Sequence, residues 1–126
     1  MNLNPTLPAL VVDDFSSVSS ITARILRALG FHHVDTAQTG EEALGMVRDK
    51  SYGLIVSDLH MKPVSGLDLL RRIKADRLTS AVPVVILTGD PLASAAESAK
   101  RAGAFAVLGK APSPGELREK LARLFA

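Results

Sequence analysis

Cysteine is absent from the chain of 126 residues, which excludes disulfides and thiolate metal sites. Tryptophan is also absent, and with only four Phe and one Tyr the core must be built from aliphatic side chains. No apolar stretch approaches the ~20 residues that a membrane span needs, and the first residues lack the pattern of a signal peptide. The net charge of +2 is too small by itself to indicate a nucleic-acid partner. We therefore expect a cytoplasmic protein that binds neither membrane nor nucleic acid.

Short apolar runs alternate with segments of helical periodicity along the chain. The runs are continuously apolar, which is typical of strands in a parallel sheet that is covered on both faces. We expect five strands, at about Ala9–Val12, Val34–Ala37, Leu54–Asp58, Val84–Thr88 and Phe105–Leu108. A helix follows each strand, so the sequence predicts a doubly wound α/β fold with a five-stranded parallel sheet and five helices. Residues 1–7 are expected to form a tail, and residues 8–126 a single domain.

The helix boundaries follow from capping residues and spacing. The predicted helices run from about Ser17 to Gly30, Thr39 to Lys50, Gly66 to Ala75, Asp90 to Gly103, and Ser113 to the end. Two of them open with the spacing of a capping box, Thr39 with Glu42 and Ser113 with Glu116. Asp90 followed by Pro91 predicts an N-cap with proline at the first helical position. The first helix has an apolar side that is expected to face the core, formed by residues that recur at helical spacing: Val18, Ile21, Ile25, Leu26 and Leu29.

Polar side chains stand where four of the expected strands end. Asp13 and Asp14 follow the first strand, and Asp58 ends the third. Thr88 ends the fourth strand, and Lys110 follows the fifth. The carboxyl ends of parallel strands lie side by side, at the edge where ligands bind. Three carboxylates, a hydroxyl and an ammonium gathered there indicate a site for a hard cation and a phosphoryl group.

These residues and their neighbours carry a resemblance to a known family. The matching segments are Asp13-Asp14-Phe15-Ser16, Asp58 with Met61, Pro63 and Gly66 after it, Thr88-Gly89, and Lys110. In order and spacing they resemble the receiver domain of two-component response regulators, and above all its single-domain, CheY-like members. The resemblance covers essentially the whole chain. It implies a flavodoxin-like fold with strand order 2-1-3-4-5.

The resemblance implies that Asp58 is the phospho-acceptor. It also implies that Mg²⁺ is the cofactor, held by Asp13, Asp14, Asp58 and the backbone carbonyl of His60. Phosphoryl transfer to a carboxylate requires the same residue types. A carboxylate is a weak nucleophile toward phosphorus until the phosphoryl charge is neutralised. Mg²⁺ prefers oxygen ligands, so carboxylates and a carbonyl suit it.

By the same resemblance, Thr88 and Lys110 contact the phosphoryl oxygens. Gly89 lies beside them, and its missing side chain leaves the approach open. His60 and Asp90 are the residues expected to tune dephosphorylation. On this interpretation the protein is not an enzyme that acts on another substrate. It accepts a phosphoryl group and assists its own phosphorylation and dephosphorylation.

Two of the departures from the family pattern concern Lys110 and the output switch. The family has proline after its lysine, with a cis peptide bond, whereas this chain reads Lys110-Ala111-Pro112. A cis bond before alanine costs ~3 kcal/mol relative to trans, so the sequence leaves open whether the bond is cis or the loop is rearranged. The aromatic switch residue of the family is replaced by Val107, so the usual rotation of a Tyr or Phe cannot occur there. We expect an intact phosphorylation site and an atypical output switch.

The expected partners are a sensor histidine kinase and a downstream protein. That protein is either a motor switch protein, as in chemotaxis, or a histidine phosphotransfer protein in a phosphorelay; a role as phosphate sink is a third possibility. The segment Pro91–Ala102, rich in small residues, is the expected partner surface. Two other classes stay open. One is an interaction module that does not use phosphate, and the other is a haloacid-dehalogenase-type phosphatase, although Asp58-Leu59-His60 lacks the second acid of that family.

Overall fold

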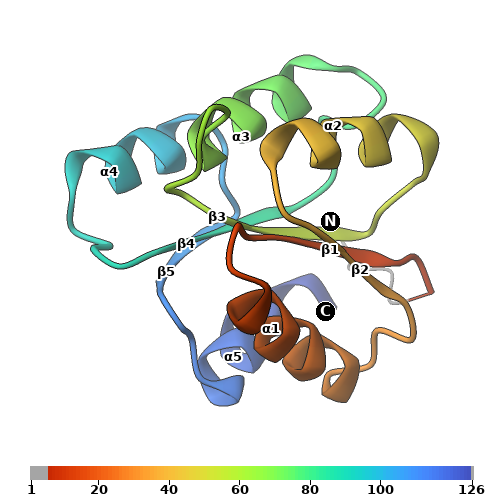
Figure 1. Ribbon diagram of the computed structural model, residues 1–126. Helices are drawn as coiled ribbons and strands as arrows, with labels where there is room; N and C mark the ends of the chain where they lie inside the picture. The colour runs from red at the N-terminus through yellow and green to blue at the C-terminus, as the bar shows by residue number, and fades with distance from the viewer. Residues whose placement is uncertain (1–5, 126) are drawn as a thin grey trace.

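One parallel sheet of five strands runs through residues 6–125, which are the residues that the computed structural model describes (Figure 1). The strands are β1 (Ala9–Val12), β2 (Val34–Ala37), β3 (Leu54–Asp58), β4 (Val84–Thr88) and β5 (Ala106–Gly109). Their order in the sheet is β2-β1-β3-β4-β5, which confirms the flavodoxin-like fold. The order reverses between β1 and β3, and in such sheets ligands bind outside the carboxyl ends of the strands at this reversal.

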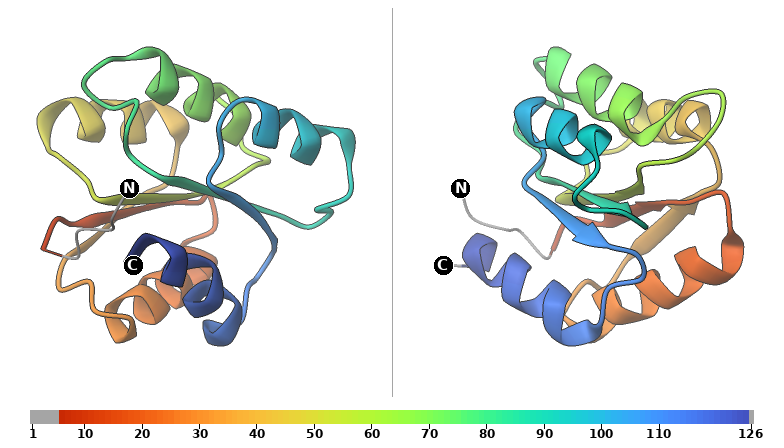
Figure 2. Two further views of the ribbon diagram at one scale, coloured as in Figure 1. Left: turned by 180° about the vertical axis from the view of Figure 1, so that it is seen from behind. Right: turned by 90° about the vertical axis from the view of Figure 1, so that its left-hand side faces the viewer.

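Five helices cover the two faces of the sheet. They are α1 (Ser16–Ala28), α2 (Gly40–Asp49), α3 (Gly66–Ala75), α4 (Ser94–Arg101) and α5 (Pro114–Phe125). Helices α1 and α5 lie on one face, and α2, α3 and α4 lie on the other (Figure 1). The side view in Figure 2 shows the sheet between these two helical layers. None of the helices within residues 6–125 is long and apolar enough to cross a membrane. Most of the expected tail, residues 1–5, lies outside the described residues.

Side chains of the strands alternate between two aliphatic cores, one on each face of the sheet. On β1, Ala9 and Val11 belong to the core that includes residues of α1 and α5, whereas Leu10 and Val12 belong to the core that includes α2 and α3. Burying an aliphatic side chain contributes roughly 1.5–3 kcal/mol. Because both faces are packed in this way, the sheet is a rigid base for the loops at its carboxyl edge.

The predicted core face of α1 is partly wrong. Ile25 and Leu26 are buried as predicted, but Ile21 is 51% exposed, and Val18 and Leu29 are only partly buried. Ser19 and Thr22 are buried in their place. Small and hydroxyl-bearing side chains let this helix lie close to the sheet, so a pattern that counts only large apolar residues misplaces its buried stripe.

Helix α4 begins later than the Asp90-Pro91 pattern predicts. Its first residue is Ser94 and its N-cap is Ala93. Asp90 instead forms a turn, in which its side chain accepts a hydrogen bond from the backbone of Leu92 at 3.1 Å and its carbonyl accepts one from Ala93 at 3.2 Å. Aspartate side chains offer the backbone such local bonds in competition with helix formation.

Two small residues of α4 are not available to the expected partner surface, whose binding role stays a prediction. Ala96 and Ala99 are fully buried, and Ala95 is partly buried. The exposed side of this helix carries Glu97 and Lys100, which pair with each other at 3.3 Å. Ala96 and Ala99 therefore serve close packing within the domain.

Candidate functional site

Two aspartates lie at the ends of β1 and β3. Asp13 follows β1, and its backbone N–H donates to the carbonyl of Ala37 on β2 at 3.0 Å. Asp58 is the last residue of β3 and pairs in register with Leu87 on β4. Asp13 is 2% exposed and Asp58 is 3% exposed. The sheet thus holds two buried carboxylates at its carboxyl edge.

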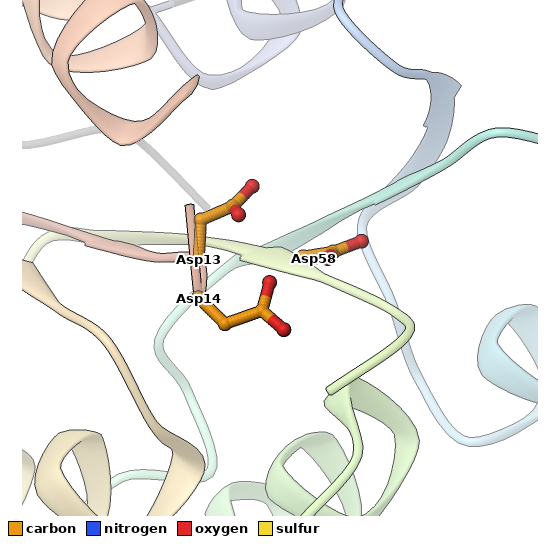
Figure 3. Close-up of side chains that lie close together, drawn as sticks. All are labelled: Asp13, Asp14 and Asp58. Carbon is orange, nitrogen blue, oxygen red and sulfur yellow. The ribbon is translucent and has the colours of Figure 1, made fainter. Parts of the chain in front are cut away.

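Asp14 completes an acidic cluster with these two residues. One carboxylate oxygen from each of Asp13, Asp14 and Asp58 lies within 4.8 Å of the other two. Figure 3 shows the three carboxylates gathered beyond the ends of β1 and β3. Asp14 is exposed, so the cluster opens to solvent on that side. The structure brings together the three acids that the sequence analysis selected.

Lys110 reaches into the cluster from the end of β5. Its Nζ lies 3.0 Å from Oδ2 of Asp58 and 3.2 Å from Oδ2 of Asp13. Its backbone N–H donates to the carbonyl of Thr88 at 2.8 Å, which anchors the residue to the sheet. Buried carboxylates are stable only when a cation or hydrogen bonds compensate them. The ammonium supplies that compensation for both acids.

The pKa shifts of Asp13 and Lys110 follow from their burial and from their mutual contacts. Burial raises the pKa of Asp13 above its ordinary value of 3.8, although the Phe15 backbone N–H and the Lys110 ammonium both act to lower it. Burial acts to lower the pKa of Lys110, but the hydrogen bonds and charges of Asp58 and Asp13 outweigh it, so that pKa is raised. One ammonium among three acids leaves room for a further cation.

Thr88 and Gly89 stand at the end of β4. Thr88 is fully buried, and its Oγ1 accepts a hydrogen bond from the backbone of Asp90 at 3.2 Å. Gly89 is exposed, and a Cβ added there would meet no protein atom within 4 Å. The protein itself therefore does not require glycine at this position. That Gly89 leaves room for a phosphoryl group stays a prediction.

His60 and Gly66 shape the loop after β3. The backbone N–H of His60 donates to Oδ1 of Asp58 at 3.4 Å, and its side chain is exposed. A Cβ at Gly66 would collide with the backbone oxygen of Asp58, and its N–H donates to the carbonyl of Leu59 at 2.9 Å. This close approach requires glycine. The start of α3 thereby fixes the loop that carries the carbonyl of His60.

Phe15 is a residue to which the sequence analysis gave no role. The centre of its ring lies 5.5 Å from Nζ of Lys110, and its backbone N–H donates to Oδ1 of Asp13 at 2.9 Å. Its place beside Asp13 and Asp14 was visible in the sequence. Its contact with Lys110 depends on how the β5 loop folds back, which local sequence does not encode.

The structure describes both the Lys110–Ala111 bond and the Val107 side chain, where the sequence departs from the family pattern. The Lys110–Ala111 peptide bond is cis, which answers the question that the sequence left open; Lys62–Pro63 is also cis. Val107 is partly buried and packs against the core that includes α2 and α3. An aliphatic side chain thus fills the position of the family's switch aromatic.

The donor set fits a hard divalent cation. Three carboxylates offer oxygen ligands within a small volume, two of them buried and one open to solvent. Magnesium prefers such oxygen ligands and keeps several waters, for which the exposed side at Asp14 leaves room. The backbone carbonyl of His60 lies in the adjoining loop.

A separate cavity of about 420 Å³ lies at the other end of β3. Tyr52 lines it and donates a hydrogen bond to Asp35 at 2.6 Å. The cavity is otherwise lined mainly by the end of α2 and the segment after α3, and none of the predicted site residues borders it.

Comparison with known proteins adds independent findings. Residues 9–122 match the profile of the response regulator receiver domain. Chemotaxis protein CheY-3 of Vibrio cholerae is 33% identical over 123 residues, which cover 98% of this chain and 95% of that protein. Chemotaxis protein CheY of Pseudomonas aeruginosa is 33% identical over 116 residues, or 92% of this chain and 94% of that protein.

Solved structures share the fold. The chemotaxis regulator CheY4 of Vibrio cholerae superimposes with a TM-score of 0.85 at 26% identity, covering 94% of this chain and 98% of that one. The receiver domain of a sensor histidine kinase from Pseudomonas aeruginosa, solved with a magnesium ion coordinated in its active site cleft, gives a TM-score of 0.84 at 26% identity. Here the match covers 94% of this chain and 97% of that one.

Proposed function

The chain belongs to the response regulator receiver family, and from this premise we propose that it is a receiver whose Asp58 accepts a phosphoryl group from a histidine kinase. The observation that carries the proposal is the ion pair of 3.0 Å between Lys110 and the buried Asp58, with two further acids beside it. An ammonium and a cluster of hard-cation ligands around one buried carboxylate suit the transfer of a phosphoryl group, which depends on positioning and on neutralisation of charge.

Asp58 is the better nucleophile of the two buried acids. Both oxygens of Asp13 have close partners, since Oδ1 accepts from Phe15 at 2.9 Å and Oδ2 pairs with Lys110 at 3.2 Å. Oδ1 of Asp58 has only the long contact of 3.4 Å with the backbone of His60. In the proposed step, an Asp58 oxygen attacks phosphorus as the bond from phosphorus to the donor atom breaks. The electron pair of that bond leaves with the donor, which is an imidazole nitrogen of the kinase or the acetate of acetyl phosphate.

The other residues have supporting roles in this proposal. Lys110 stays beside the charge that passes to Asp58, and the Thr88 hydroxyl turns from Asp90 to donate to a phosphoryl oxygen. Mg²⁺ is the proposed cofactor, held by Asp13, Asp14, Asp58 and the backbone carbonyl of His60. When bound, it neutralises phosphoryl charge. The magnesium ion in the related receiver of Pseudomonas aeruginosa supports this assignment.

In this proposal, the protein is not an enzyme that acts on another substrate. It accepts the phosphoryl group and later loses it to water, with the exposed side chains of His60 and Asp90 placed at the rim to tune that loss. We place it in the cytoplasm, where kinase domains draw on ATP and where a chain without cysteine needs no oxidising compartment.

The proposed partners are a sensor histidine kinase and a downstream protein. The relatives named as chemotaxis proteins support a motor switch protein as that partner, and a histidine phosphotransfer protein is the second candidate. Val107, in place of a switch aromatic, favours a different role in which phosphate is relayed or stored, or is not used at all.

Intact-mass spectrometry tests the proposal directly. With acetyl phosphate and Mg²⁺, the wild-type protein should gain one phosphoryl group, and Asp58→Asn should gain none while keeping its circular dichroism spectrum. Asp49→Asn, an exposed aspartate away from the site, serves as the matched control and should be modified like wild type. A wild-type protein that gains no mass would leave the phosphate-independent module as the better interpretation.

A further inference from the structure

Phe15 brings an aromatic ring to the acidic cluster from the loop between β1 and α1. The ring centre lies 5.5 Å from Nζ of Lys110, and the same ammonium lies 3.0 Å from Asp58 and 3.2 Å from Asp13. At such a distance the face of a ring attracts a cation. The ammonium thus has three partners, two carboxylates and one ring.

The backbone fixes the point from which this ring projects. The N–H of Phe15 donates to Oδ1 of Asp13 at 2.9 Å. Its carbonyl accepts from the N–H groups of Val18 and Ser19, each at 3.1 Å. The backbone of Phe15 is therefore held between Asp13 and the first turn of α1, and its ring lies beside Lys110.

Neither helix capping nor burial accounts for a phenylalanine at position 15. Phe15 is the N-cap of α1 and makes no side-chain capping bond, where a Ser, Thr, Asp or Asn would typically contribute about 1 kcal/mol. It is also 61% exposed, so it gains little from burial. A residue that breaks a local rule without a packing reason points to a functional constraint. The ring does contact Lys110.

The three partners of Lys110 differ in how they respond to a divalent cation. Asp13 and Asp58 belong to the oxygen cluster, so any cation held there shares their charge with the ammonium and repels it. A hard cation prefers oxygen, and the ring face does not compete for it. The ring of Phe15 is therefore the partner that Lys110 keeps when a divalent cation binds Asp13.

We propose that Phe15 is a positioning residue that keeps the ammonium of Lys110 beside Asp58 when a divalent cation occupies the acids. Its consequence for phosphoryl transfer rests on the proposed function. Without the ring, the flexible lysine stem would let the ammonium move into solvent, away from the oxygen that attacks phosphorus.

The position of Lys110 can be measured without phosphorylation. Ring currents shift the Hε protons of a lysine that lies over an aromatic face upfield in NMR spectra. Wild type and Phe15→Tyr should show this shift for Lys110, and Phe15→Leu should not. The shift in wild type should persist at saturating MgCl₂. If MgCl₂ moves the wild-type Hε protons to their position in Phe15→Leu, the proposal is overturned.

Kinetics with acetyl phosphate and Mg²⁺ then test the consequence. We expect Phe15→Leu to slow phosphorylation about two- to fivefold, and Phe15→Tyr to restore the rate. Ile21→Ala, which changes an exposed apolar residue on α1, is the control and should leave the rate unchanged. Equal rates for wild type and Phe15→Leu, or equal slowing by Leu and Tyr, would contradict the positioning role. A wild-type protein that takes up no phosphoryl group would refute the proposed function, and the MgCl₂ titration would still decide the position of Lys110.

Discussion

The ammonium of Lys110 is the residue-scale feature on which the site depends. It compensates two carboxylates that are nearly inaccessible to solvent. The Lys100–Glu97 pair on α4 has a similar geometry at 3.3 Å, but its side chains are 51% and 52% exposed. An exposed ion pair contributes little because water screens it, whereas removing one partner of a buried pair leaves an uncompensated charge.

These two lysines give a matched prediction. Without divalent cations at neutral pH, Lys110→Met should lower the free energy of unfolding by about 2–4 kcal/mol. Lys100→Met should change it by less than about 0.5 kcal/mol. Urea denaturation followed by circular dichroism measures both values. Equal losses in the two variants would show that Lys110 does not compensate Asp13 and Asp58.

Outside the site, Tyr52 donates a short hydrogen bond of 2.6 Å to Asp35. This bond is the main cause that lowers the pKa of Asp35 below its ordinary value of 3.8. A carboxyl with a lowered pKa contributes stability above its unfolded-state pKa, and that stability is lost as pH falls through the folded-state pKa. Tyr52→Phe should therefore cost about 1–2 kcal/mol at pH 7, with a smaller cost in acid. Denaturation curves from pH 7 down to pH ~3 check the trend, and a pH-independent cost would argue against the charged bond.

The sequence predicted the residue types of the site better than their contacts. Asp13, Asp58 and Lys110 could be selected because each follows an apolar strand, and parallel strands end at one edge. The ring of Phe15 could not be selected from the sequence, because its contact with Lys110 joins two loops that are distant in the chain.

At the scale of elements, the ends of helices determine how the loops of the site are held. Helix α3 begins against the end of β3 because Gly66 has no side chain to meet the backbone of Asp58. Gly45, in the middle of α2, is exposed and has no protein atom within 4 Å of its missing Cβ. The same amino acid is thus required in one helix and costly in the other.

Alanine substitutions at these two glycines should have opposite effects. Gly66→Ala should destabilise the protein by roughly 1–3 kcal/mol, because the start of α3 must move away from β3. Gly45→Ala should stabilise it by about 0.5–1 kcal/mol, since alanine is the better helix former. Thermal denaturation of the two variants measures the difference. If Gly66→Ala were as stable as wild type, the close approach of α3 to β3 would be wrong.

Strand boundaries were predicted more closely than helix starts. Four strands have the predicted bounds and β5 is shifted by one residue, because strands packed between two helical layers are marked by mainly apolar runs. The start of α4 was missed because Asp90 can cap a helix or close a turn, and tertiary context favours the turn through Thr88. The burial of Ala96 and Ala99 was missed because composition alone does not show which way a small residue faces.

At the scale of the whole molecule, a divalent cation should link the acidic cluster to folding. The unfolded chain does not hold Asp13, Asp14 and Asp58 together, so a cation that binds them stabilises only the folded state. At 100 times its dissociation constant, Mg²⁺ should add about 2.7 kcal/mol to the free energy of unfolding, which raises Tm by roughly 10 °C. Differential scanning calorimetry with Mg²⁺, and then with excess EDTA, measures this shift. An unchanged Tm would count against a magnesium site.

The central claim is that Asp58, among three clustered acids, accepts the phosphoryl group. Borohydride reduces an aspartyl phosphate to homoserine, so peptide mass spectrometry after this reduction identifies the modified residue. After treatment with acetyl phosphate and Mg²⁺, we predict homoserine at position 58 and unmodified aspartate at positions 13 and 14. Homoserine at position 13 or 14, or at none of the three, would contradict the account.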